Sequence, residues 1–268
     1  YDYIGVTIDE DNIYKIYGIN EDEEKYLDVK TFYEVKDMIN IDKKIVLYSD
    51  AVNELRYDNK KKEFYFYELD EFYNKYDNVK LTHDYMVISD DEKISYKKYG
   101  SDTFENVEQA KEYKISNNKI YFYNKENIYE FDMKTKEKKI IAMYERDDII
   151  ELLDVSDKYL FYLKNNVLNA CSLEKFANYD LSSLSFYSIS NDGFITLENK
   201  VLKNYSISKG EYLYDYFVSG NINNLFYLDN NNFYLSFDDN YVIIDMKSSK
   251  VWKNLSNKYI YLMKVNNT

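Results

Sequence analysis

Short runs of apolar residues alternate with polar clusters along the whole chain. The segment at 119–140, KIYFYNKENIYEFDMKTKEKKI, shows the pattern: two runs rich in Tyr, Phe and Ile are joined by Asn-Lys-Glu-Asn and followed by a lysine-rich turn. Runs of four to eight β-branched and aromatic residues between polar turn residues are typical of β-strands. The segment is therefore predicted to form a β-hairpin.

A looser version of this hairpin recurs seven times along the chain. The seven copies begin at Tyr3, Lys44, Tyr85, Lys119, Tyr159, Gly193 and Asn232. Their second strands begin near residues 13, 52, 94, 128, 167, 201 and 241, an average period of about 38 residues. A fixed period of this length indicates a repeat architecture. About 20 residues separate each lysine-rich turn from the next hairpin, which leaves room for two further strands in each unit.

Four strands per repeat predict an all-β fold, a single β-propeller domain over residues 1–268 with about seven short blades, six or eight being the alternatives. Middle strands of stacked blades are buried on both faces, so they need not alternate apolar with polar residues. Packing between blades therefore accounts for most of the 33 tyrosines, the alternative being an aromatic platform for a ligand. The last apolar segment, KYIYLMKV at 258–265, is expected to complete the first blade and close the fold, or else to open an eighth, truncated blade.

Units of the kind IYFYN and IYEFD resemble those of the quinoprotein-like and other divergent bacterial β-propellers, and the resemblance covers essentially the whole chain. The chain lacks the Gly-His and Trp-Asp marks of WD repeats, the paired glycines of kelch repeats and the tryptophan-docking pattern of quinoprotein dehydrogenases. It has only six glycines and one tryptophan. The resemblance therefore implies the fold, but no specific family and no cofactor.

The composition excludes several functional classes. A net charge of −13 and a pI near 4.7 repel phosphate groups, so neither nucleic acid nor an anionic membrane is an expected partner. Cys171 is the single cysteine, which rules out an intramolecular disulfide and a cysteine-based zinc site. No apolar run has the roughly 18 residues of a membrane span. Because the numbering starts at Tyr1 rather than at methionine, a signal peptide, an anchor or an earlier domain is expected before it. The expected location is extracytoplasmic, either secreted or anchored at the cell surface.

Candidate catalytic and metal-binding residues are few. His83, the sole histidine, precedes Asp84 and is either part of a His-Asp general base or a residue of a surface turn, with no serine or cysteine motif near it. Two arginines cannot form the arginine triad of sialidase-type propellers, and no glycine-rich nucleotide-binding loop occurs. The paired carboxylates lack the spacing of an EF-hand calcium loop. No catalytic residue, metal ligand or cofactor is therefore assigned.

Charge differs between the two sets of turns in the repeat. The loops inside the seven hairpins sum to −7, whereas the turns after the second strands sum to +2. In a propeller these two sets lie on opposite faces, which predicts one acidic face. The predicted binding residues on it are Asp9, Asp11, Asp90, Asp91, Asp238 and Asp239.

These residues predict a non-enzymatic recognition module that binds a protein or other macromolecule carrying complementary positive charge. One alternative is a carboxylate-based hydrolase or lyase acting on sugars or peptides, with a catalytic pair from Asp90, Asp91, Asp238 and Asp239. Another is a structural subunit of a larger surface assembly.

Overall fold

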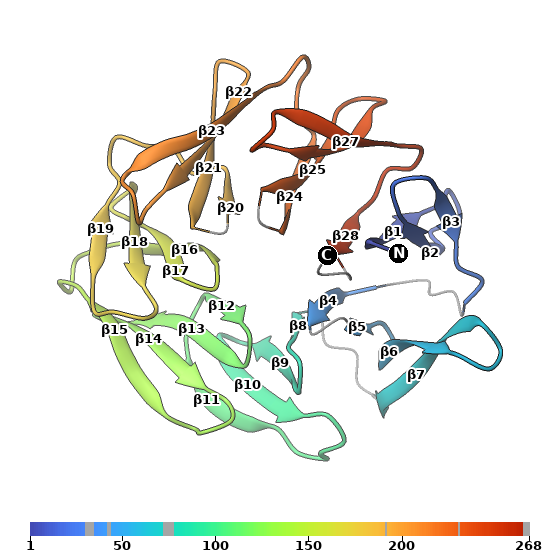
Figure 1. Ribbon diagram of the computed structural model, residues 1–268. Helices are drawn as coiled ribbons and strands as arrows, with labels where there is room; N and C mark the ends of the chain where they lie inside the picture. The colour runs from blue at the N-terminus through green and yellow to red at the C-terminus, as the bar shows by residue number, and fades with distance from the viewer. Residues whose placement is uncertain (30–34, 42–43, 72–77, 191, 230, 265–268) are drawn as a thin grey trace. The chain divides into compact units, whose positions relative to one another are not determined.

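The computed structural model describes residues 1–268 except 30–34, 42–43, 72–77, 191, 230 and 265–268. Its described residues form 28 strands arranged as seven four-stranded antiparallel sheets (Figure 1). They include no helix long and apolar enough to cross a membrane. The fold is a seven-bladed β-propeller, which confirms the predicted class and number of blades.

The chain divides into two compact units. Unit 1 comprises residues 1–90, 94–106 and 253–268, and unit 2 comprises residues 91–93 and 107–252. The prediction of a single domain over residues 1–268 stays a prediction.

Unit 1 contains three sheets. The first has the order β28-β1-β2-β3, with β28 (Tyr261–Lys264), β1 (Tyr3–Ile8), β2 (Tyr14–Ile19) and β3 (Glu24–Tyr26). The second consists of β4 (Asp37–Ile41), β5 (Lys44–Tyr48), β6 (Ala51–Asp58) and β7 (Glu63–Glu71). The third consists of β8 (Val79–Leu81), β9 (Tyr85–Asp90), β10 (Lys93–Lys98) and β11 (Glu105–Gln109), whose last residues belong to unit 2.

Unit 2 contains four sheets, each built from strands consecutive in the chain. The first is formed by β12 (Tyr113–Ser116), β13 (Lys119–Asn124), β14 (Asn127–Asp132) and β15 (Lys138–Met143), and the second by β16 (Ile150–Val155), β17 (Tyr159–Lys164), β18 (Val167–Ser172) and β19 (Asn178–Asp180). The third is formed by β20 (Ser188–Ser190), β21 (Gly193–Glu198), β22 (Val201–Ser206) and β23 (Glu211–Phe217). The fourth is formed by β24 (Asn224–Asp229), β25 (Asn232–Ser236), β26 (Tyr241–Asp245) and β27 (Lys250–Leu255), whose last residues belong to unit 1.

Most buried apolar side chains lie in the two middle strands of each sheet, in agreement with the unbroken apolar runs of the sequence. In unit 2, four phenylalanines that are each 0% exposed lie in the first strands of successive hairpins, β13, β17, β21 and β25: Phe122, Phe161, Phe194 and Phe233. The rings of Phe161 and Phe194 meet edge to face, with centroids 5.6 Å apart, and so join two neighbouring sheets. Apolar side chains on both faces of a strand are thus used in packing between sheets. The largest fully buried side chains include five tyrosines: Tyr48, Tyr96, Tyr162, Tyr234 and Tyr259.

The C-terminal strand completes the first sheet, as predicted. β28 pairs antiparallel with β1, in a register that places Leu262 opposite Gly5. Just before β28, the ring of Tyr259 lies against Gly5, where an added Cβ would approach it to 2.3 Å. The Tyr259 hydroxyl donates a hydrogen bond of 2.7 Å to Glu24, which also accepts the Ser256 N–H at 2.6 Å. The two ends of the chain are therefore joined by strand pairing, ring packing and a shared carboxylate.

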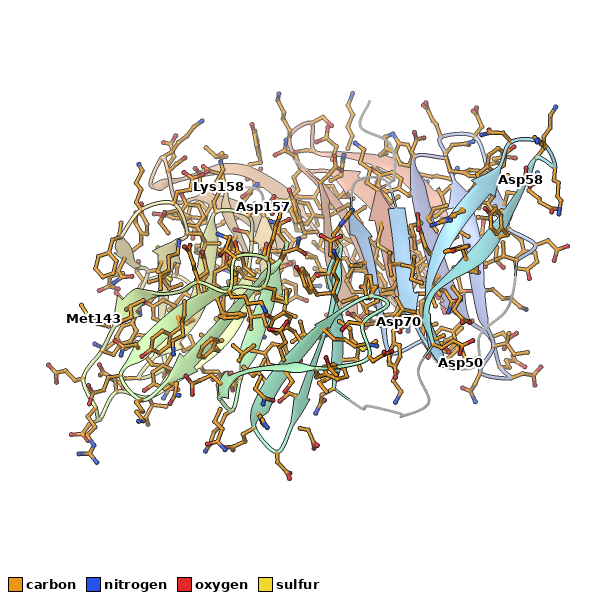
Figure 2. All side chains as sticks on the ribbon, turned by 90° about the horizontal axis from the view of Figure 1, so that it is seen from below. Asp50, Asp58, Asp70, Met143, Asp157 and Lys158 are labelled. Carbon is orange, nitrogen blue, oxygen red and sulfur yellow. The ribbon has the colours of Figure 1, made fainter. Side chains whose placement is uncertain are left out.

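Each sheet has its hairpin turn at one end and the next turn at the other. In the second sheet, β6 runs between these two turns, and Asp50 and Asp58 appear at its opposite ends (Figure 2). The comparison of charge between the two sets of turns assumed this placement of the turns at opposite ends of each sheet.

Candidate functional site

The hairpin turns hold the six predicted aspartates, and several of these turns have an unusual backbone. In the β9–β10 turn, Asp91 and Glu92 have φ of +46° and +63°. Two successive left-handed residues are typical of the type I′ turn that joins tightly paired strands. Asp and Asn tolerate this conformation better than most residues, because their short side chains bond to nearby backbone groups. Two other hairpin turns of unit 2 share it, at Asn165–Asn166 and Asn199–Lys200.

Asp9 stabilises its own turn. Its Oδ1 accepts the N–H groups of Asp11 and Ile13 at 3.0 and 2.8 Å, and its Oδ2 lies 3.0 Å from the Lys15 ammonium. The N–H of Ile13 and the hydrogen bond from Lys15 together lower the pKa of the Asp9 carboxyl. This carboxylate already bonds to groups of its own turn and is the least available of the six for a partner.

The other five predicted aspartates are exposed at the tips of three turns. They are Asp11 between β1 and β2, Asp90 at the end of β9 with Asp91 directly after it, and Asp238 and Asp239 between β25 and β26. Within the part of the chain that the structure describes, their side chains form no hydrogen bond or ion pair. Their charges are therefore open to solvent and to any partner that approaches these turns.

In unit 2 the connections between sheets run beside the hairpin turns. The N–H of Ala110 donates to the Glu92 carbonyl at 2.7 Å, and that of Tyr144 donates to the Glu126 carbonyl at the same distance. Val218 makes the equivalent bond of 2.8 Å to Lys200. The surface at this end of the sheets is thus built from hairpin turns and connections held together by backbone hydrogen bonds.

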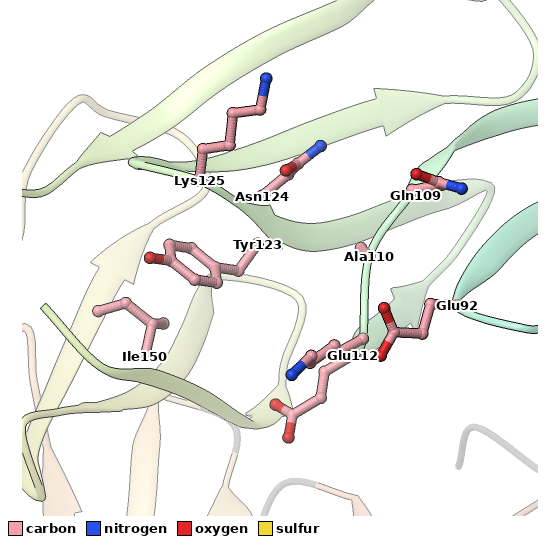
Figure 3. A pocket seen from close by; sticks show the side chains of 9 residues that line it. Glu92, Gln109, Ala110, Glu112, Tyr123, Asn124, Lys125 and Ile150 are labelled. Carbon is pink, nitrogen blue, oxygen red and sulfur yellow. The ribbon is translucent and has the colours of Figure 1, made fainter. Parts of the chain in front are cut away.

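A cavity of about 370 Å³ opens at this end of the first sheet of unit 2 (Figure 3). Glu92 comes from the β9–β10 turn and Glu112 from the connection into β12. Tyr123 comes from the end of β13, Lys125 from the turn after it, and Ile150 from the start of β16. The Tyr123 and Ile150 side chains lie on one side, and the carboxylates of Glu92 and Glu112 on the other.

Two of these side chains are fixed by hydrogen bonds. Glu112 Oε2 accepts the Leu152 N–H at 2.9 Å, and the Tyr123 hydroxyl donates to the Asp148 carbonyl at 3.4 Å. Burial raises the pKa of Tyr123, with Asp148 adding to the effect. The cavity therefore offers an apolar wall and charged groups of both signs.

The structure brings His83 and Asp84 together in the β8–β9 turn, where His83 Nδ1 lies 2.8 Å from Asp84 Oδ1. The His83 and Asp84 side chains are 34% and 40% exposed, so the pair lies at the surface. The described residues contain no group of three or more His, Cys, Asp and Glu side chains that could hold a metal ion. The aspartate pairs considered for acid–base catalysis are exposed at turn tips, whereas reaction sites are usually concave.

Sequence reasoning missed the cavity residues Glu112, Tyr123, Lys125 and Ile150. They come from separate strands and connections, and no local motif links them. Only the assignment of 110–112 as a connection beside the third hairpin turn could have indicated that Glu92 and Glu112 lie near each other.

Comparisons with known proteins show the fold alone. No protein-family model and no curated protein sequence matches the chain. AztD from Citrobacter koseri has a TM-score of 0.58 at 9% identity, covering 98% of this chain and 89% of that one. The dihydro-heme d1 dehydrogenase NirN in complex with DHE has a TM-score of 0.54 at 11% identity, over 95% of this chain and 63% of that one. Hsv2 from Kluyvelomyces marxianus has a TM-score of 0.52 at 10% identity, over 79% and 76%. The chain is a divergent β-propeller without a specific family.

Proposed function

We propose that the protein is a non-enzymatic recognition module whose hairpin turns bind a cationic protein or other macromolecule, outside the cytoplasm. One observation carries the proposal: Asp11, Asp90, Asp91, Asp238 and Asp239 are exposed and make no side-chain bond with other described residues. Carboxylates without an internal partner contribute little to folding, and their field accelerates the approach of an oppositely charged molecule.

The test compares two sets of substitutions. The acidic set changes these five aspartates to asparagine, and it omits Asp9 because that residue bonds within its turn. The control set changes four exposed lysines of the turns at the other end of their sheets to glutamine: Lys60, Lys61, Lys134 and Lys136. Both sets remove charge at nearly constant side-chain size.

Binding is measured by surface plasmon resonance against an array of Lys- and Arg-rich 15-residue peptides, with sequence-matched acidic peptides as the reference. We expect the acidic set to slow association, and added salt to slow association of the wild type, because exposed charges are screened beyond a Debye length of about 8 Å at physiological ionic strength. The proposal fails if no basic peptide exceeds the acidic reference, or if the lysine set loses binding while the aspartate set keeps it. Fractionation of the source cells tests the location separately.

A further inference from the structure

A second cavity, of about 470 Å³, lies in unit 1 and is walled by aromatic rings. Tyr26 ends β3, Tyr57 and Phe64 flank the β6–β7 turn, and Tyr1 precedes β1. Tyr26 and Tyr57 are 41% and 47% exposed, which is high for side chains of this size. We call this cavity, defined by these four rings, the aromatic groove.

The rings are held in place by their neighbours. The Phe64 ring lies 4.9 Å from that of Tyr57 and 6.1 Å from that of Tyr1. Tyr1 rests on Gly18, where an added Cβ would come within 2.4 Å of its ring. Tyr26 meets Tyr17 edge to face at 5.8 Å. A ligand that stacks on these rings therefore finds them already positioned, so less side-chain entropy is lost on binding.

Besides Leu27, the lining contains four exposed charged side chains: Lys25, Asp28, Lys62 and Glu63. Their charges cancel, so the groove has no preference for an anion or a cation. Lys25, Asp28 and Lys62 make no side-chain hydrogen bond or ion pair with other described residues, and Glu63 lies 3.6 Å from Lys61. The groove thus offers both donors and acceptors around a set of aromatic faces.

We propose that the aromatic groove binds a neutral oligosaccharide. A pyranose ring presents apolar C–H faces that stack on tyrosine, and a rim of hydroxyl groups, each of which can donate and accept a hydrogen bond. Stacking would use Tyr26 and Tyr57, while hydroxyls would donate to Asp28 and Glu63 and accept from Lys25 and Lys62. Amphipathic aromatic walls with a few polar groups that fix orientation are the usual composition of a small-ligand site.

A proline-rich segment is the other ligand that aromatic grooves commonly bind. Proline has no N–H, so such a segment presents chiefly carbonyl acceptors. It could use the two lysines but would leave Asp28 and Glu63 without a donor. The paired donors and acceptors of the groove therefore favour a ligand rich in hydroxyl groups.

The experiment is isothermal titration calorimetry of the full chain with maltohexaose, cellohexaose and chitohexaose, and with a ten-residue oligoproline peptide. We expect at least one hexasaccharide to bind, and Tyr57→Ala and Tyr26→Ala each to weaken that binding about tenfold or more, equal to about 1.4 kcal/mol. Asp28→Asn with Glu63→Gln should weaken it further, because two charged acceptors become neutral ones.

Tyr67→Ala is the matched control. Tyr67 is also 47% exposed but lies outside the groove, with the Arg56 guanidinium 3.8 Å above its ring. Its replacement should leave saccharide binding unchanged, and thermal unfolding of all variants excludes loss of folding as the cause. The proposal is overturned if no hexasaccharide binds at millimolar concentration, if Tyr67→Ala weakens binding as much as Tyr57→Ala, or if only oligoproline binds.

Discussion

Replacing Tyr259 with alanine should destabilise the protein more than most single substitutions, because this side chain anchors the C-terminal segment to the first sheet. The Tyr259 ring is 0% exposed and lies against Gly5. Truncating a buried aromatic ring to alanine costs about 3–5 kcal/mol. Its hydroxyl also donates to Glu24, and a hydrogen bond to a charged group contributes about 1.5–3 kcal/mol. Glu24 keeps the Ser256 N–H after the change, so this carboxylate is not left without a donor.

The loss of the ring alone, near 4 kcal/mol, corresponds to a fall in Tm of about 8–16 °C for a chain of this size, and the loss of the hydrogen bond adds to that fall. Circular dichroism on heating measures it, with size-exclusion chromatography to detect association through the β1 edge that β28 covers. Tyr259→Phe keeps the ring and should lose only the part that belongs to the hydroxyl. Tyr212→Ala, at a position 39% exposed, should shift Tm little. A Tm for Tyr259→Ala within about 2 °C of the wild type would show that the C-terminal segment does not hold the first sheet.

Three further outcomes are expected. Burial raises the pKa of Asp154, so its ionised form is disfavoured in the folded protein and stability falls as the pH rises above 3.8. Asp154→Asn should therefore raise Tm at pH 7 and leave it unchanged near pH 3. Lys97 and Asp70 form a 2.8 Å ion pair only 6% and 8% exposed, so Lys97→Met should cost about 3–5 kcal/mol in urea unfolding, and the double change Lys97→Met with Asp70→Leu should cost less. Burial raises the pKa of Cys171 to about 12, so the native thiol should not react with iodoacetamide, and labelling before denaturation would contradict its burial.

The hairpins could be predicted from the sequence because their strands are buried on both faces. Each second strand begins within one residue of the predicted start, for example β6 at Ala51 and β18 at Val167. The outer strands carry no such signal. β3 (Glu24–Tyr26) and β19 (Asn178–Asp180) have three residues each and are mostly exposed, so their side chains follow no core pattern.

Long-range contacts could not be predicted from the sequence, because the residues that form them have no distinctive local pattern. Glu24 binds Ser256 and Tyr259, more than 230 residues away, and nothing in the local pattern distinguishes it from the acidic residues beside it. The aromatic groove has the same character, since its rings come from three separate segments. The tyrosine excess predicted packing between sheets, but it could not tell which rings would remain exposed.

Backbone conformation distinguishes aspartates that the turn itself favours from aspartates that the turn does not require. Asp91 has a φ of +46°, a conformation that favours Asn or Asp whatever the partner. Asp238 and Asp239 are not among the left-handed residues, so the backbone of their turn does not require them. Asparagine suits both turns, and the substitution therefore removes charge without changing backbone preference. If binding depends on charge at these turns, Asp238→Asn with Asp239→Asn should slow association of a basic peptide at unchanged Tm; an unchanged association rate would assign these two aspartates to solubility alone.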